Sequence, residues 1–144
     1  MARLGMAYTM EDAIADLRAH SLDAPQKPSL PDPAFIDDYE RRIGFSFPAD
    51  YKQFLMEASD VFVGAITPLI ITESGEGPDE LSVVLQEARD VGVPAEWLLI
   101  CEDNGDYYCL TKEGTIRFWS HDGTTEESWS DLAIWIRDVW IAGN

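Results

Sequence analysis

The sequence has few basic residues, few cysteines and no long apolar run. Its 144 residues include 10 Lys and Arg against 27 Asp and Glu, which gives a formal net charge of −17. Such a charge repels phosphate backbones and anionic membrane surfaces, so neither nucleic acid nor a membrane is an expected partner. No apolar run approaches the length that spans a bilayer. Residues 1–6 lack the features of a secretory signal, and we expect a cytoplasmic protein.

The sequence also lacks the spacings that mark metal and cofactor sites. Its two His and two Cys residues do not form close ligand pairs, and the Gly-rich loop at 75–78 is not followed by the Lys of a phosphate-binding loop. The acidic segment 102–106 offers oxygen ligands around a Gly but lacks the length and terminal Glu of an EF-hand. We therefore expect no metal and no cofactor.

The two cysteines, Cys101 and Cys109, stand on either side of an Asn104-Gly105 pair. Asn-Gly between two apolar runs is the strongest short-range signal for a two-residue hairpin turn. Such a turn places Cys101 opposite Tyr108 and Ile100 opposite Cys109. Because side chains alternate between faces along a strand, the two cysteines should point to opposite faces. This geometry argues against a disulfide and predicts two buried free thiols.

A second turn, at Glu113-Gly114, completes a predicted three-stranded meander in the C-terminal half of the chain. Extending the pairing across a two-residue turn at this point places Tyr108 opposite Trp119 and Asp106 opposite His121. A carboxylate that orients an imidazole is half of a general-base device. Ser120 is adjacent to His121 on the strand and so faces the other way, whereas Cys101 lies one strand away on the face of Asp106, which makes a Cys-His arrangement geometrically conceivable. The more economical interpretation is a His fixed by an acid near a strand end.

Capping signals and helical spacing of apolar residues predict five helices. The predicted N-caps are Thr9, Asp32, Asp79 and Ser128, and Pro48 starts the remaining helix. The helices are expected at residues 10–22, 33–43, 48–58, 80–90 and 129–139. Short strands are expected at residues 61–63 and 69–71, and residues 124–127 are expected to be a polar connection.

Helices gather before and after the strands without regular β-α alternation. This order indicates an α+β fold with a mainly antiparallel sheet, a C-terminal three-stranded meander and about five flanking helices. The length suits a single domain over residues 1–144, with residues 1–8 as a loosely ordered start.

Two separated segments together resemble the SUKH superfamily of Smi/Knr-like proteins. Residues 36–55 (IDDYERRIGFSFPADYKQFL) are similar to the family pattern of a helix ending in Gly, a Pro step and a helix that begins with an acidic-Tyr pair. Residues 104–116 are similar to its Gly-Asp turn, strand, turn and strand. The resemblance covers residues 30–140. It departs from the family after Leu55, where an Asn-Gly-Gly-like turn is replaced by residues 56–60 (MEASD).

The resemblance implies an α+β fold without catalytic machinery, in a family whose bacterial members often neutralise a cognate toxin by binding it. We therefore expect an immunity protein that is not an enzyme and that occludes a cationic, nucleic-acid-targeting toxin domain. A regulatory interaction scaffold of the same fold is the alternative, and a hydrolase that uses His121 is a third. The oligomeric state stays open.

The expected partner surface combines acidic and aromatic residues. Acidic side chains beside an exposed Tyr suit a Lys- and Arg-rich partner. On the last helix, Trp135 lies on the apolar stripe, whereas two other Trp residues fall off it and suit an interface. The predicted partner-binding residues are Glu102, Asp103, Asp106, Tyr107, Asp122, Trp129 and Trp140.

Overall fold

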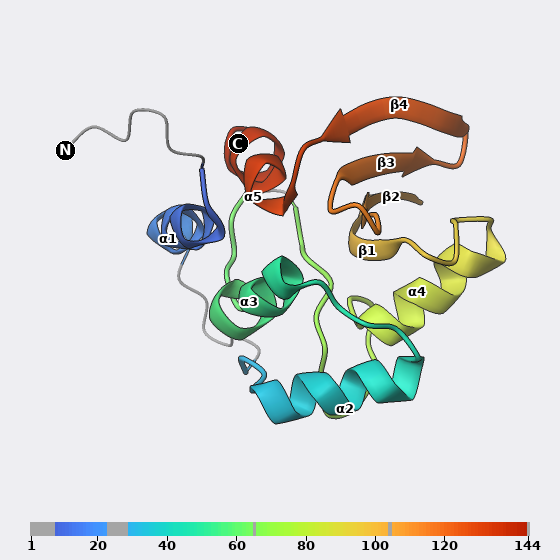
Figure 1. Ribbon diagram of the computed structural model, residues 1–144, viewed down its shortest axis with the longest axis horizontal. Coiled ribbons are helices and arrows are strands. Elements are labelled where there is room, and N and C mark those ends of the chain that lie inside the picture. The colour runs from blue at the N-terminus through green and yellow to red at the C-terminus, as the bar shows by residue number, and fades with distance from the viewer. Residues whose placement is uncertain (1–7, 23–28, 65, 104, 144) are drawn as a thin grey trace.

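The computed structural model describes residues 8–22, 29–64, 66–103 and 105–143, apart from the side chains of residues 123 and 124. It has the predicted α+β fold, with helices packed against an antiparallel sheet (Figure 1). In chain order the elements are α1 (Met10–His20), α2 (Pro33–Ile43), α3 (Ala49–Ala58), α4 (Leu81–Asp90), β1 (Leu98–Asp103), β2 (Asp106–Leu110), β3 (Ile116–Ser120), β4 (Gly123–Trp129), α5 (Leu132–Trp135) and the π-helix η1 (Ile136–Ile141).

Local capping chemistry sets the ends of the first two helices as predicted. Thr9 forms a capping box with Asp12 at the start of α1. Asp32 accepts a hydrogen bond from the Phe35 backbone N–H and is followed by Pro33 in the first turn of α2. Gly44 ends α2 in the left-handed region, with φ of 69°, where a residue without Cβ is favoured.

Two predicted caps are wrong. Glu80, rather than Asp79, occupies the N-cap position of α4, and Asp131, rather than Ser128, caps α5 through its side chain. Ser128 belongs instead to β4. The helices begin one to three residues later than predicted, because Glu80 forms a bridge with Ile70 and Ser128 pairs with Arg117 of β3.

The β1–β2 hairpin has the predicted register at its tip. Asp103 pairs with Asp106 and Cys101 pairs with Tyr108, whereas Cys109 pairs with Leu99 because a bulge intervenes between Leu99 and Cys101. Both cysteines are buried and free.

The β2–β3 register differs from the prediction by one residue. Tyr108 pairs with Phe118 rather than Trp119. The reason is the turn: the Thr111 N–H donates to the Thr115 carbonyl over 2.9 Å, which leaves a three-residue loop that ends at Gly114 with φ of 91°. Three-residue hairpin loops place a residue in the left-handed region at this position.

The sheet has a fourth strand that the sequence did not indicate. Residues 123–129 pair antiparallel with β3 and complete the order β1-β2-β3-β4. Glu126, Glu127 and Ser128 are exposed on this edge strand, so it lacks the alternating apolar pattern that marks a half-buried strand. The two segments predicted as strands before α4 form only isolated bridges, Val63 with Ile66 and Ile70 with Glu80.

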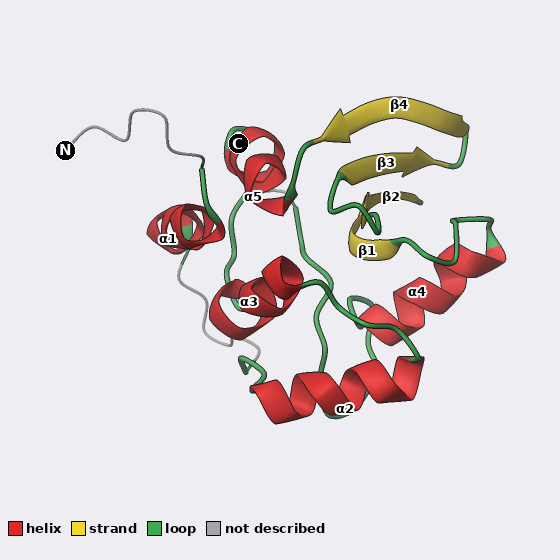
Figure 2. Cartoon of the chain, viewed as in Figure 1, coloured by secondary structure: helices red, strands yellow, loops and turns green. Residues whose placement is uncertain are grey.

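The helices and the sheet share one continuous core (Figure 2). Four consecutive residues of β1, from Leu98 to Cys101, are buried, so both faces of this strand are covered. α1 packs against α3, α5 and η1, and α4 contacts β1. The largest fully buried side chains are those of Trp135, Trp140, Tyr39, Tyr51 and Phe54. No helix in the described part of the chain is both long enough and apolar enough to cross a membrane.

Candidate interaction surface at the paired hairpin turns

The β1–β2 and β3–β4 turns lie at the same end of the sheet and bring most of the predicted acidic residues together. We call Glu102, Asp103, Asp106, His121 and Asp122 the hairpin tip. Asp103 and Glu102 are exposed, and the Asp122 side chain is 85% exposed. Glu102 also braces the turn, because its carboxylate accepts the Gly105 backbone N–H over 2.6 Å. The tip is thus a set of carboxylates at the ends of two neighbouring hairpins.

Asp106 and His121 contact each other as predicted, although the strand register differs. Asp106 Oδ1 accepts the His121 backbone N–H over 3.0 Å and lies 2.6 Å from the ring Nδ1. These hydrogen bonds, the backbone one first, lower the pKa of Asp106. The side-chain hydrogen bond to Asp106, followed by the charges of Asp122 and Asp106, raises the pKa of His121.

This pair resembles a carboxylate-imidazole device, but the neighbouring groups do not extend it to a catalytic arrangement. Cys101 is 1% exposed, and burial raises the pKa of its thiol, so the protonated form is favoured. His121 lies in the solvent-exposed turn. Ser120 accepts the Asp122 backbone N–H over 3.2 Å, as expected for a turn residue. The geometry suits a structural role, in which the Asp106–His121 pair holds the β1–β2 turn against the β3–β4 turn.

The acidic surface continues beyond the hairpin tip into elements that the sequence analysis did not assign to it. Burial, followed by the charge of Glu102, raises the pKa of Asp79 in the loop before α4. The charges of Glu102 and of Glu87 on α4 add to burial in raising the pKa of Tyr107. Asp79 had been interpreted only as a helix cap, and no local signal links α4 to the hairpin.

Two of the predicted aromatic contacts are buried, which corrects their expected exposure. Tyr107 is 6% exposed, and its ring packs 5.7 Å from that of Trp119. Trp140 is 2% exposed, and its Nε1 donates to the Val63 carbonyl over 2.9 Å. Trp140 lies inward because η1 is a π-helix, whose wider turns bring residue 140 beside Trp135, at a ring separation of 6.1 Å.

Trp129 is half-buried at the far end of β4 from the hairpin tip. Its ring meets that of Tyr108 edge-on at 5.7 Å, and its place in a partner interface stays a prediction. On the other face of the sheet, Trp119 and Arg117 are half-buried, and the Arg117 guanidinium lies 5.5 Å from the Trp97 ring centre. The sequence analysis did not predict that Arg117, Trp119 and Trp97 lie together. It paired Trp119 with Tyr108, whereas Trp119 pairs with Tyr107 and therefore lies on the other face of the sheet.

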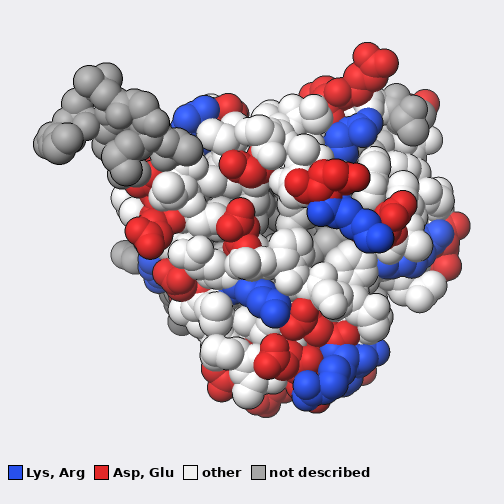
Figure 3. Space-filling view, viewed as in Figure 1, with Lys and Arg blue, Asp and Glu red and all other residues white. Residues whose placement is uncertain are grey.

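On the face drawn in Figure 3, charged side chains of both signs are spread over the surface. Figure 3 shows Asp and Glu side chains across the whole visible face, with Lys and Arg side chains among them. Within the described residues, no three His, Cys, Asp or Glu side chains are grouped so that they could hold a metal ion.

Comparison with known proteins identifies the family. The family model described as SMI1-KNR4 cell-wall, SUKH_5, matches residues 10–141. The crystal structure of a protein from Pseudomonas syringae pv. tomato is similar, with 37% sequence identity and a TM-score of 0.84 over 90% of this chain and 97% of that one. A search of curated proteins gives no match. The family match and the shared architecture lead to one conclusion: this chain belongs to the SMI1-KNR4 family of the SUKH superfamily.

Proposed function

We propose that this protein is an immunity protein that binds a cationic toxin domain through the hairpin tip. The observation that carries the proposal is the gathering of Glu102, Asp103, Asp106 and Asp122 at one end of the sheet. Family membership supports a protein partner, because SUKH proteins typically have no catalytic machinery and many bacterial members bind a toxin.

The acidic field supports a mechanism in which electrostatics accelerates association. A net charge of −17 steers a basic partner toward the protein, and the association rate then falls as salt screens the field. A nuclease or another enzyme that grips nucleic acid presents a basic substrate site. Carboxylates seated on that site occlude it without any chemical step.

The test is co-expression with a toxin domain encoded beside this gene, followed by measurement of the purified complex. The wild-type protein should restore growth and form a complex on gel filtration. Reversing two tip charges, Glu102→Lys with Asp103→Lys, should slow association at least tenfold. The matched control, Asp37→Lys with Glu57→Lys, makes the same charge change on exposed positions of α2 and α3 and should change it less than threefold.

Two outcomes would contradict the proposal. Absence of both rescue and complex formation would refute the immunity role and favour a regulatory scaffold, which should bind several unrelated proteins. Equal effects of the tip and control substitutions would show that only net charge matters and that the hairpin tip is not the interface.

A further inference from the structure

A hollow lies at the opposite end of the sheet from the hairpin tip. The segment that joins α2 to α3 forms one wall, and the start of β1 and the end of β2 form the other, enclosing about 570 Å³. A second hollow of about 500 Å³ shares Gly44, Phe45 and Ala95 with it and continues between α2 and α4. We call the two together the linker groove.

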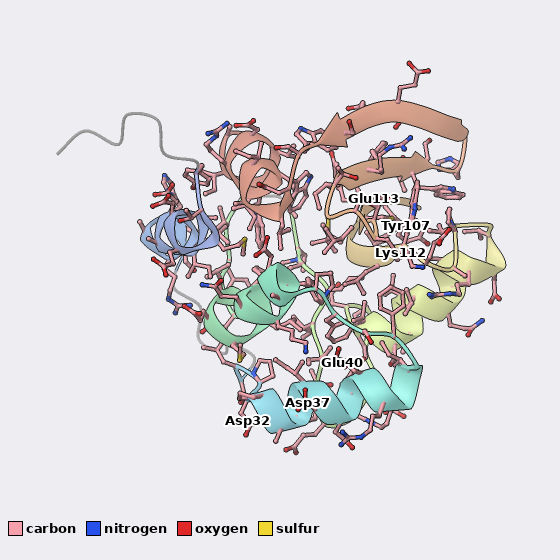
Figure 4. All side chains as sticks on the ribbon, viewed as in Figure 1. Asp32, Asp37, Glu40, Tyr107, Lys112 and Glu113 are labelled. Carbon is pink, nitrogen blue, oxygen red and sulfur yellow. The ribbon has the colours of Figure 1, made fainter. Side chains whose placement is uncertain are left out.

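The floor of the linker groove is apolar. Phe47, Leu98 and Leu110 are buried in it, whereas Phe45 and Pro48 are half-buried and still present surface to the groove. Glu40 fixes the wall that the segment between α2 and α3 forms. Its Oε2 accepts the Phe47 backbone N–H over 2.6 Å, and its Oε1 lies 3.3 Å from Lys52 Nζ. In Figure 4, Glu40 lies on the side of α2 toward the sheet.

The lining of the linker groove is basic, in contrast to the rest of the protein. Arg42, Arg89 and Lys112 line it, against one carboxylate, that of Glu96, which lies 3.9 Å from Lys112 Nζ. These are three of only 10 basic residues in a chain with 27 acidic ones. Two other hollows are lined by acidic residues without basic ones, Asp32 with Glu73 in one and Asp79 in the other.

Arg42 is engaged within α2, because its Nε lies 3.5 Å from Asp38 Oδ2 and its guanidinium lies 5.0 Å from the Tyr39 ring centre. The other two cations of the groove are only partly engaged by the protein itself. Arg89 donates to the carbonyls of Ala95, over 2.5 Å, and Leu85, over 3.4 Å, and it pairs with no carboxylate among the residues that the structure describes. The Lys112 side chain is 76% exposed at the β2–β3 turn. A backbone carbonyl leaves the guanidinium with its full charge, so an incoming carboxylate would find donors already oriented.

We propose that the linker groove binds an acidic segment of a partner protein that carries an apolar side chain. The apolar side chain would cover Phe45 and Pro48, and the flanking carboxylates would face Arg89 and Lys112. Charge complementarity selects this occupant, because a basic segment would be repelled here and attracted to the hairpin tip instead. The proposal is independent of the toxin-binding role of the tip.

A direct test uses three fluorescein-labelled hexapeptides and fluorescence anisotropy. The probe EDFLDE carries both features, EDSSDE carries only the charge and SSFLSS carries only the apolar side chains. We expect EDFLDE to bind at least tenfold more tightly than either of the others, and its affinity to fall as NaCl rises from 50 to 500 mM. Amide chemical-shift changes on addition of EDFLDE should centre on Gly44, Phe45 and Ala95.

Two variants with equal charge change locate the binding. Lys112→Glu should weaken EDFLDE binding at least fivefold, whereas Arg137→Glu, which alters an exposed residue of η1, should change it less than twofold. Near-ultraviolet circular dichroism confirms that each variant is folded.

Three results would overturn the proposal. They are equal binding of EDFLDE and EDSSDE, equal effects of the two substitutions, and no saturable binding of EDFLDE up to 1 mM. Sedimentation velocity tests whether a second copy of this chain binds in the groove. Self-association that Lys112→Glu abolishes would show that it does, and this result would overturn the proposal of an acidic partner segment.

Discussion

Tyr39→Phe removes one buried oxygen atom from the contact between α2 and α4, and we expect it to lower the free energy of unfolding by about 2 kcal/mol. The Tyr39 hydroxyl donates to Glu80 Oε2 over 2.7 Å and accepts the Ser82 backbone N–H over 2.9 Å. Tyr39 and Glu80 are only 1% and 2% exposed, so water does not replace the lost bonds. Glu80 keeps two further hydrogen bonds, from the Thr72 N–H and hydroxyl. The variant therefore leaves a weakened, still anchored carboxylate.

Urea unfolding at pH 7 measures the effect, because burial raises the pKa of Tyr39 to about 12 and the hydroxyl stays protonated. With a slope of about 2 kcal/mol per M, the midpoint should fall by about 1 M. The matched control is Tyr51→Phe. The Tyr51 hydroxyl is buried but has no hydrogen-bond partner among the described residues, so its removal should leave stability unchanged or raise it by about 1 kcal/mol. Equal losses in the two variants would refute the hydrogen-bond argument and point to ring packing alone.

Three further predictions concern the turn, the helix end and the thiols. The pKa of His121 is raised on folding, so its pairing stabilises the protein fully below the unfolded pKa of about 6.5, and this stabilisation is lost as pH rises through the folded pKa. The pKa of Asp106 is lowered on folding, so its contribution to stability is lost as pH falls below about 4. The urea midpoint of wild type relative to His121→Gln should therefore be greatest between pH 4 and 6.5 and should decline on both sides; a difference that is flat in pH would contradict the pairing. Gly44→Ala should cost about 1 kcal/mol in urea unfolding, because an added Cβ meets no atom within 4 Å but must adopt a φ of 69°. Neither Cys101 nor Cys109 should react with a thiol reagent in the native state at pH 8, and both should react in urea, because both are buried and burial raises their pKa values, that of Cys109 to about 12.

The parts of the fold that were predictable from sequence are those that short-range chemistry determines. The capping box at Thr9, the Asp32-Pro33 start and the Gly44 end each involve residues within four positions of one another. The β1–β2 turn is equally local, and its pairing of Asp103 with Asp106 was correct. Each of these features has one favoured backbone geometry, so a sequence pattern suffices.

The errors arise where a distant contact or one extra residue decides the geometry. The loop that ends at Gly114 has three residues rather than two, and that difference moves every β2–β3 pair by one position. Trp140 turns inward because the π-helix brings it to the Val63 carbonyl, 77 residues away. The edge strand β4 has a polar sequence because much of it faces solvent. Propensity alone contains none of this information.

The candidate site was predicted in part because its charges tolerate such errors. Asp106 and His121 meet despite the shifted register, because His121 lies just beyond the end of β3, where its backbone N–H and ring reach the same carboxylate oxygen. The aromatic members were less predictable, because exposure depends on what covers them: Trp119 and Glu87 of α4 lie beside Tyr107. A local pattern can identify a charged turn but not the element that packs over its neighbour.

The distribution of charge along the sheet links the two proposed surfaces. Glu102 lies near the tip end of β1, whereas Leu98, at its other end, lines the linker groove. At about 3.3 Å per residue, Leu98 and Glu102 are separated by about 13 Å, which exceeds the screening length of about 8 Å at physiological salt. The acidic tip and the basic groove therefore act on different partner surfaces with little mutual cancellation. A single partner that engaged both would need basic and acidic patches at a matching separation.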